Sequence, residues 1–276
     1  MSEGPDQGRS TGKPANFGAG VSGGRGAPGT VEALASRVLS VVASNSNVSR
    51  SALREDLLEE LIAAVMCFDN APREAVLARF TAAGVSRAKV VDRYIPAAAQ
   101  KLGVAWCEDQ MSFADVTIGS ARLQAILRDM RAPQVTDPGA QSVLVAVPQD
   151  AYHTLGASVL ADQLRRFGIA PHMALGLGLG ELSELVETHD YNAVLISAAS
   201  SQRLESIRDM VNCVRTASRS NTPIVLGGSV MDIDTDIKTL TGADYVSNNP
   251  EEALKACGLT IPVRAVALPG HSGSGG

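Results

Sequence analysis

His153 is the residue of this chain best placed to do chemistry. It lies in the stretch VLVAVPQDAYHTLG, residues 143–156, where a polar turn follows an apolar run and precedes a glycine that opens an amphipathic helix. This order places an imidazole at the carboxyl end of a strand, the edge where open α/β sheets bind their ligands. Because a neutral imidazole is a common metal ligand, His153 is a candidate to hold a metal there.

Two groups of small residues follow later strands in the same way. Ser197-Ala198-Ala199 comes after the third predicted strand, and Gly227-Gly228 comes after the fourth. Because the carboxyl ends of parallel strands meet at one edge of a sheet, we expect both groups to lie near His153. Glycines at such a place let a flat or elongated ligand approach the backbone.

The elements that must position these residues alternate between strand and helix. Strands are expected at 142–147, 172–175, 193–197, 224–226 and 244–246, and helices at 155–167, 180–188, 202–218, 233–240 and 251–257. Alternation of this kind is typical of a parallel sheet with right-handed crossovers. We therefore predict a Rossmann-like (flavodoxin-like) α/β domain over residues 141–262.

The first half of the chain has a helical period instead. Helices are expected at 31–43, 53–66, 72–83, 86–106 and from Ser112 to about 131. The short loops between them favour antiparallel neighbours, so residues 30–131 are predicted to form a helical bundle. Residues 1–29 and 263–276 are rich in Gly and Ser, and we expect them to be disordered tails.

Composition excludes several classes of protein. The chain has 276 residues and a net charge of -5, and it contains no long basic run, so direct DNA binding has no electrostatic footprint. Its four cysteines form no Cys-x-x-Cys pair, which disfavours a zinc or redox site. No signal peptide and no apolar run of membrane-spanning length are present, so we expect a cytoplasmic protein.

The residues at the strand ends resemble the cobalamin-binding domain of methionine synthase, corrinoid proteins and cobalamin mutases. That family's pattern is Asp-x-His-x-x-Gly, then Ser-x-Leu, then Gly-Gly. The resemblance implies that His153 replaces the cofactor's own benzimidazole below cobalt, and that the displaced tail enters a slot beside the sheet. It also implies a set of cofactor-binding residues, namely Gly156, Ser197, Ala199, Gly227 and Gly228. The implied cofactor is adenosyl- or hydroxocobalamin, with His153 as the cobalt ligand.

Two positions depart from that pattern. Ala151 stands where the family has an aspartate that orients the imidazole and raises its basicity, and Asp150 is one residue further back. Ala199 replaces the leucine and gives the slot less bulk. We therefore expect a cobalamin site in which the histidine has altered surroundings, better suited to sensing than to methyl-transfer turnover.

The helical half carries a second resemblance. Its segment LGVAW, residues 102–106, is similar to the Leu-Gly-x-x-Trp segment of the bundle that caps cobalamin in methionine synthase and in light-sensing regulators such as CarH. The resemblance implies that Trp106 covers the upper face of the cofactor. Val116 and Thr117 occupy the positions of a Glu-His pair, so the histidine that binds cobalt after light in those regulators is absent. Phe113, Val116 and Thr117 are expected to bind the cofactor together with Trp106.

The chain as a whole looks like the AerR/PpaA antirepressors of photosynthesis genes, which act on repressors of the CrtJ/PpsR type. This resemblance implies a light-responsive regulator and not an enzyme, with a repressor protein as its partner and no contact with DNA or membrane. Two alternatives remain open. One is a corrinoid shuttle protein for methyl transfer, against which Ala151 argues. The other is a flavodoxin-like interaction domain without a cofactor.

Overall fold

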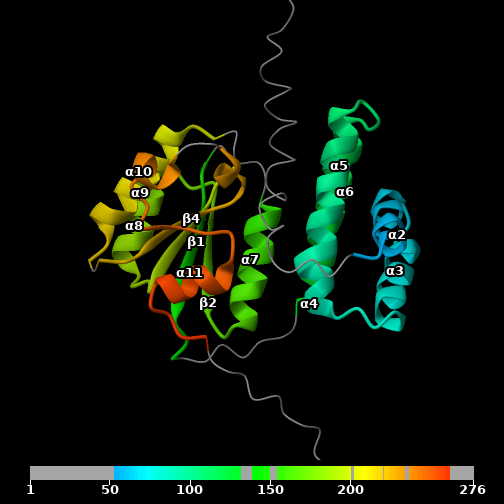
Figure 1. Cartoon of the computed structure of the whole chain (residues 1–276), viewed down its shortest axis with the longest axis horizontal. Coiled ribbons are helices and arrows are strands. Elements are labelled where there is room, and N and C mark those ends of the chain that lie inside the picture. Colours follow the sequence, from blue (N-terminus) through cyan, green and yellow to red (C-terminus); the bar gives the residue numbers. More distant parts are fainter. Residues whose placement is uncertain are drawn as a thin grey trace, which may run out of the picture.

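The computed structural model describes residues 53–131, 139–149, 154–199, 202–219, 221–233 and 236–261. The helix expected at 31–43, the tails at 1–29 and 263–276, and the segment 150–153 with Asp150, Ala151 and His153 lie outside the described residues. A group of helices stands beside a parallel sheet with helices packed on it (Figure 1). The predicted fold class, a helical bundle followed by a Rossmann-like domain, is confirmed.

The helical half agrees with the predicted elements apart from one interruption. Its helices are α2 (Glu55–Met66), α3 (Ala71–Ala82), α4 (Arg87–Lys89), α5 (Ile95–Cys107) and α6 (Phe113–Asp129). The helix expected at 86–106 contains a π-helical turn, η1 (Val90–Tyr94), because Pro96 has no N–H for the bond to the carbonyl four residues earlier. Ser112 and Asp115 form the expected capping box at the start of α6.

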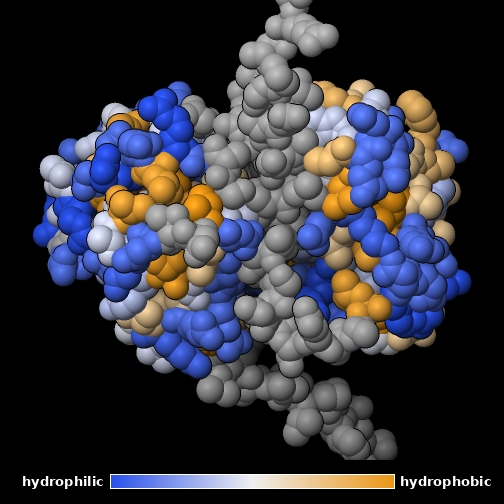
Figure 2. Space-filling model, turned by 45° about the horizontal axis from the view of Figure 1, so that its top comes forward, coloured by the Kyte–Doolittle hydropathy of each residue, from blue (hydrophilic) through white to orange (hydrophobic). Residues whose placement is uncertain are grey.

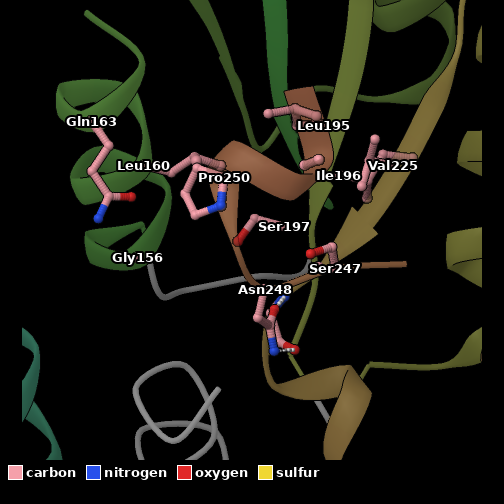
Figure 3. A pocket seen from close by; sticks show the side chains of 13 residues that line it. Gly156, Leu160, Gln163, Leu195, Ile196, Ser197, Val225, Ser247, Asn248 and Pro250 are labelled. Atoms are coloured by element: carbon pink, nitrogen blue, oxygen red, sulfur yellow. Dashed lines mark hydrogen bonds between the residues drawn. The ribbon is translucent and has the colours of Figure 1, made fainter. Parts of the chain in front are cut away.

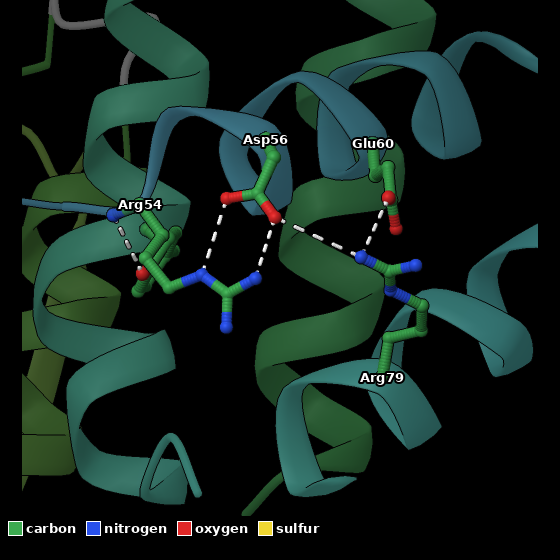
Figure 4. Close-up of polar contacts among 5 residues, drawn as sticks. Arg54, Asp56, Glu60 and Arg79 are labelled. Atoms are coloured by element: carbon green, nitrogen blue, oxygen red, sulfur yellow. Dashed lines mark hydrogen bonds and ion pairs between the residues drawn. The ribbon is translucent and has the colours of Figure 1, made fainter. Parts of the chain in front are cut away.

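Ion pairs on the outside of α2 and α3 link the two helices at their surface (Figure 4). Arg79 of α3 lies 3.0 Å from Glu60 of α2 and 3.7 Å from Asp56, whereas Arg54, which lies 2.6 Å from Asp56, is itself at the start of α2. About half of each of these side chains is exposed, so the pairs add little stability. The bundle depends instead on its apolar core, in which Tyr94 is buried and its hydroxyl accepts a hydrogen bond from the Arg54 N–H at 3.1 Å.

The sheet has five parallel strands in the order β2-β1-β3-β4-β5. Their bounds are β1 (Ser142–Val147), β2 (Ala170–Leu175), β3 (Ala193–Ser197), β4 (Ile224–Gly227) and β5 (Tyr245–Val246). The chain leaves β1 towards β2 on one side and returns to β3 on the other. The carboxyl ends of β1 and β3 therefore lie at the switch point where doubly wound sheets bind ligands.

Helices cover both faces of the sheet. One face packs against α7 (Leu155–Arg166) and α11 (Pro250–Ala256), and the other packs against α8 (Leu179–Thr188) and α9 (Leu204–Ala217). The helix expected at 233–240 is wrong in position, because a 3-10 turn, η2 (Ser229–Asp232), comes first and α10 is Ile237–Thr241. Asp236 determines the start of α10, since its side chain accepts a hydrogen bond from the Thr239 N–H.

Helix α7 belongs to both halves of the molecule. Leu155 and Val159 are buried in the core of the bundle, whereas Ala157 and Leu164 are buried against the sheet. Figure 1 shows α7 between the sheet and the pair α5–α6. The two halves are therefore packed together through one shared helix.

The described surface is mostly polar, with apolar side chains gathered in separate patches on both halves (Figure 2). Phe68 and Phe113 are the most exposed large apolar residues of the described bundle, at 90% and 59%. Within the described ranges, none of the helices has both the length and the apolar character needed to cross a bilayer.

Candidate functional site

A pocket lies on the α7–α11 face of the sheet, next to the carboxyl ends of β3 and β4 (Figure 3). Its cavity volume is about 80 Å³, and about 600 Å³ of empty space is counted when the open solvent around it is included. Leu160 of α7, Leu195 and Val225 of the strands, and Ala253 of α11 form apolar walls. Polar side chains also line the pocket, and they are Gln163, Ser197, Ser247 and Asn248. Apolar walls with a few polar groups are the lining that small-molecule sites usually have.

The structure brings four of the predicted site residues together in this pocket. Gly156 at the start of α7, Ser197 at the end of β3, and the Gly227-Gly228 pair at the end of β4 all line it. The β3–β4 register pairs Ser197 with Gly227, so these two residues share one level of the sheet. Ala199 is buried and does not line the pocket, and its N–H donates to Gln202 Oε1 at 2.8 Å.

The glycine pair is required by the fold itself as well as by any ligand. A Cβ on Gly227 would lie 2.7 Å from the Ser247 carbonyl oxygen, and a Cβ on Gly228 would lie 2.2 Å from the Ala198 carbonyl oxygen. Gly228 also has a φ of +101°, in a region that side chains rarely adopt. Both positions must therefore be glycine for the neighbouring strand ends to approach so closely.

Asn248 is a pocket residue that the sequence did not reveal. The Gly228 N–H donates to Asn248 Oδ1 at 2.7 Å, and Asn248 Nδ2 donates to the Gly228 carbonyl oxygen at 3.4 Å. It follows β5 directly in the run Ser247-Asn248-Asn249, which is the signal that could have identified it. These polar residues follow the fifth strand just as the other predicted residues follow theirs.

The residues predicted to cover the cofactor lie at one end of the bundle, and none of them lines the sheet pocket. Trp106 is partly buried, and its ring lies 5.7 Å from the ring of the exposed Phe113. Thr117 is exposed, and its hydroxyl donates to the Phe113 carbonyl oxygen at 2.8 Å. Val116, in contrast, is buried inside the bundle core, so it faces away from any ligand outside the bundle.

Two buried nitrogens in the described part of the chain lack a hydrogen-bond partner. They are Arg165 Nη1 on α7 and Gln202 Nε2 just after β3. Burial, together with the nearby charge of Arg131, lowers the pKa of Arg165. Neither residue lines the sheet pocket, whose polar side chains are Gln163, Ser197, Ser247 and Asn248.

This arrangement defines a class of protein: a doubly wound α/β domain with a ligand pocket at the carboxyl edge of its sheet, joined to a helical bundle. Residues 141–257 match the B12 binding domain family. The chain is also 34% identical over 174 residues to an uncharacterized 20.5 kDa protein in the bchF-crtJ intergenic region of Rhodobacter capsulatus, over 62% of this chain and 91% of that protein. The chain belongs to the B12 binding domain family.

A solved structure with a similar fold is the monomethylamine corrinoid protein of Methanosarcina barkeri. The match has a TM-score of 0.57 at 15% sequence identity, and it covers 74% of this chain and 97% of that chain. At this identity the likeness concerns the fold. Because it extends over both the helices and the sheet, the two halves together form an architecture already known in a corrinoid protein.

Proposed function

We propose that this protein is a cobalamin-dependent, light-responsive transcriptional regulator of the cytoplasm that acts as an antirepressor and not as an enzyme. The observation that carries the proposal is the pocket itself, where Gly156, Ser197, Gly227 and Gly228 line one cavity in a chain of the B12 binding domain family. Bound cobalamin would supply a cobalt–carbon bond that light can break.

In this proposal, three groups of residues hold three parts of the cofactor. His153, which directly precedes Thr154 at the start of α7, would be the lower cobalt ligand. The pocket between α7 and α11 would take the nucleotide tail, with apolar contacts from Leu160 and Val225. Trp106 and Phe113 would cover the opposite face of the cofactor from the bundle.

The partner in this proposal is a repressor protein of the CrtJ/PpsR type. The Rhodobacter capsulatus relative is in the bchF-crtJ intergenic region, which supports a partner encoded beside it. The net charge of -5 supports contact with a protein and not with DNA. Light would act as a switch only if the partner binds the two states of the regulator with different affinity.

Reconstitution tests the proposal. The full chain is mixed in the dark with hydroxo- or adenosylcobalamin and desalted, and its visible spectrum is recorded. We expect corrin bands to remain with the protein, and we expect His153→Ala to lose the wild-type spectrum. A protein without retained bands would be the cofactor-free interaction domain. Retained bands with no effect of illumination on spectrum or repressor binding would contradict the sensor and favour the methyl-transfer shuttle.

A further inference from the structure

The last position of the β4–β5 pairing is completed by a side chain and not by backbone. The Ser247 N–H donates to the Leu226 carbonyl oxygen at 3.1 Å, which continues the ladder one residue beyond β5. At the next position the carboxamide of Asn248 takes the place of a peptide group, because it accepts from the Gly228 N–H and donates to the Gly228 carbonyl. Figure 3 shows this side chain near Ser247, among the residues that line the pocket.

Gly228 is held on its other side by β3. The Ala198 N–H donates to the Gly227 carbonyl oxygen at 2.9 Å, and the Val230 N–H donates to the Ala198 carbonyl oxygen at 3.2 Å. The glycine turn therefore has hydrogen-bonded neighbours on two sides, Ala198 after β3 and Asn248 after β5. These contacts hold Gly228 at its φ of +101°. Removing the carboxamide leaves a half-buried N–H of Gly228 without its partner and frees one side of the turn.

The same segment also determines the opposite wall. Asn249, next in the chain, caps α11 by accepting hydrogen bonds from the N–H groups of Glu251 and Glu252. Pro250 and Ala253 of α11 then form the wall that faces α7. Asn248 is therefore the point at which the glycine wall and the α11 wall of the pocket are joined.

We propose that Asn248 is a positioning residue for the cofactor's nucleotide tail, and that through Gly228 it makes the pocket selective for corrinoids that carry this tail. The inference rests on the proposed cobalamin function and names a determinant of specificity in the same site. A corrinoid without the tail has nothing to place between α7 and α11. Its affinity is then insensitive to the shape of this pocket.

The test compares two ligands on matched variants of the full chain. Hydroxocobalamin carries the tail and hydroxocobinamide lacks it, and the dissociation constant of each is measured by titration of the visible spectrum. The variant is Asn248→Ala. The control is Asn192→Ala, which removes the same kind of bond at the opposite edge of the sheet, where the Ser142 N–H donates to Asn192 Oδ1 at 2.8 Å. Thermal unfolding of each ligand-free variant provides a readout independent of the cofactor.

We expect Asn248→Ala to bind hydroxocobalamin about tenfold more weakly, as for the loss of one well-placed hydrogen bond, and to bind hydroxocobinamide within about twofold of wild type. Asn192→Ala should leave the ratio of the two affinities unchanged, even if it lowers the unfolding temperature as much as Asn248→Ala does. Asn248→Asp keeps the acceptor for the Gly228 N–H, so its ratio should lie between those of wild type and Asn248→Ala.

An Asn248→Ala variant that weakens both ligands equally, or neither, would overturn the role of Asn248. Should Asn248→Ala not fold, Asn248→Asp decides the matter in its place, and a wild-type ratio for Asn248→Asp would overturn the same role. A wild-type protein that retains neither corrinoid would refute the cobalamin function itself, and this outcome is visible before any variant is compared.

Discussion

Gly228→Ala is the sharpest test of the site geometry. The new Cβ would lie 2.2 Å from the Ala198 carbonyl oxygen and 3.0 Å from the Ala198 nitrogen, so the backbone must move. The backbone of Gly228, with φ +101° and ψ -175°, lies in a region that is essentially restricted to glycine, and a side chain there costs of order 1–3 kcal/mol. Moving Ala198 away also breaks its two hydrogen bonds to Gly227 and Val230, at about 1 kcal/mol each.

We therefore expect Gly228→Ala to lower the free energy of unfolding by about 3–5 kcal/mol in urea denaturation followed by circular dichroism. Gly176→Ala is the matched control, because Gly176 follows β2 at the same edge of the sheet, has a φ of +67°, and has nothing within 4 Å of its Cβ position. That variant isolates the backbone cost and should lose only about 1 kcal/mol. Equal losses for the two variants would refute the steric reasoning.

Three further predictions follow from the described contacts. Asp92→Asn should lower the free energy of unfolding by about 1–2 kcal/mol, because the Arg166 and Asp92 side chains are only 28% and 24% exposed, whereas Glu60→Gln at the half-exposed pair with Arg79 should change it little. Burial and the charge of Asp244 raise the pKa of Cys257 to about 11, so the unfolded chain loses the thiol proton at a lower pH than the folded chain does. The free energy of unfolding should therefore fall as pH rises from about 9 to 11. A Cys257→Ser variant should show a smaller fall in the same urea titrations. Trp106 is the single tryptophan of the chain, so cobalamin bound beneath it should quench the protein's tryptophan emission, and a bound state with undiminished emission would contradict its place over the cofactor.

The sheet could be predicted well where apolar runs end at turn residues. The bounds of β1 and β3 agree with the prediction because both strands are buried, continuous apolar runs. β2 begins at Ala170, two residues before the predicted start, because it is an edge strand and so tolerates Pro171. The helix predicted at 233–240 failed because apolar spacing does not locate a start, which depends on the cap at Asp236.

The pocket could be predicted only as far as local motifs extend. Gly156, Ser197 and the glycine pair follow their strands, so chain order and the parallel sheet bring them together. The place of Asn248 after β5 could have identified it as a pocket residue, but its hydrogen bond with Gly228, 20 residues away, follows no local pattern. Val116 occupies a motif position that suggested contact with the cofactor, but its side chain is buried in the bundle core. The close packing of α5 and α6, where a Cβ on Gly119 would lie 2.8 Å from Leu102, determines which face of α6 is buried.

Helix α7 connects the pocket to the helical bundle, because it contacts both. At its first turn Gln124 of α6 donates to the Thr154 hydroxyl at 3.3 Å, and at its last turn Arg166 pairs with Asp92 in η1. Because both ends are tied to the bundle, α7 cannot slide along its axis without breaking one of these contacts. Gly156 and Leu160 of this helix help to line the pocket, and Leu155 and Val159 of the same helix pack in the bundle core, so a movement of α7 at the pocket would also be felt in that core. Interiors are close-packed and respond to such changes by repacking, so under the proposed function the surface of the bundle is where a partner would distinguish the two states.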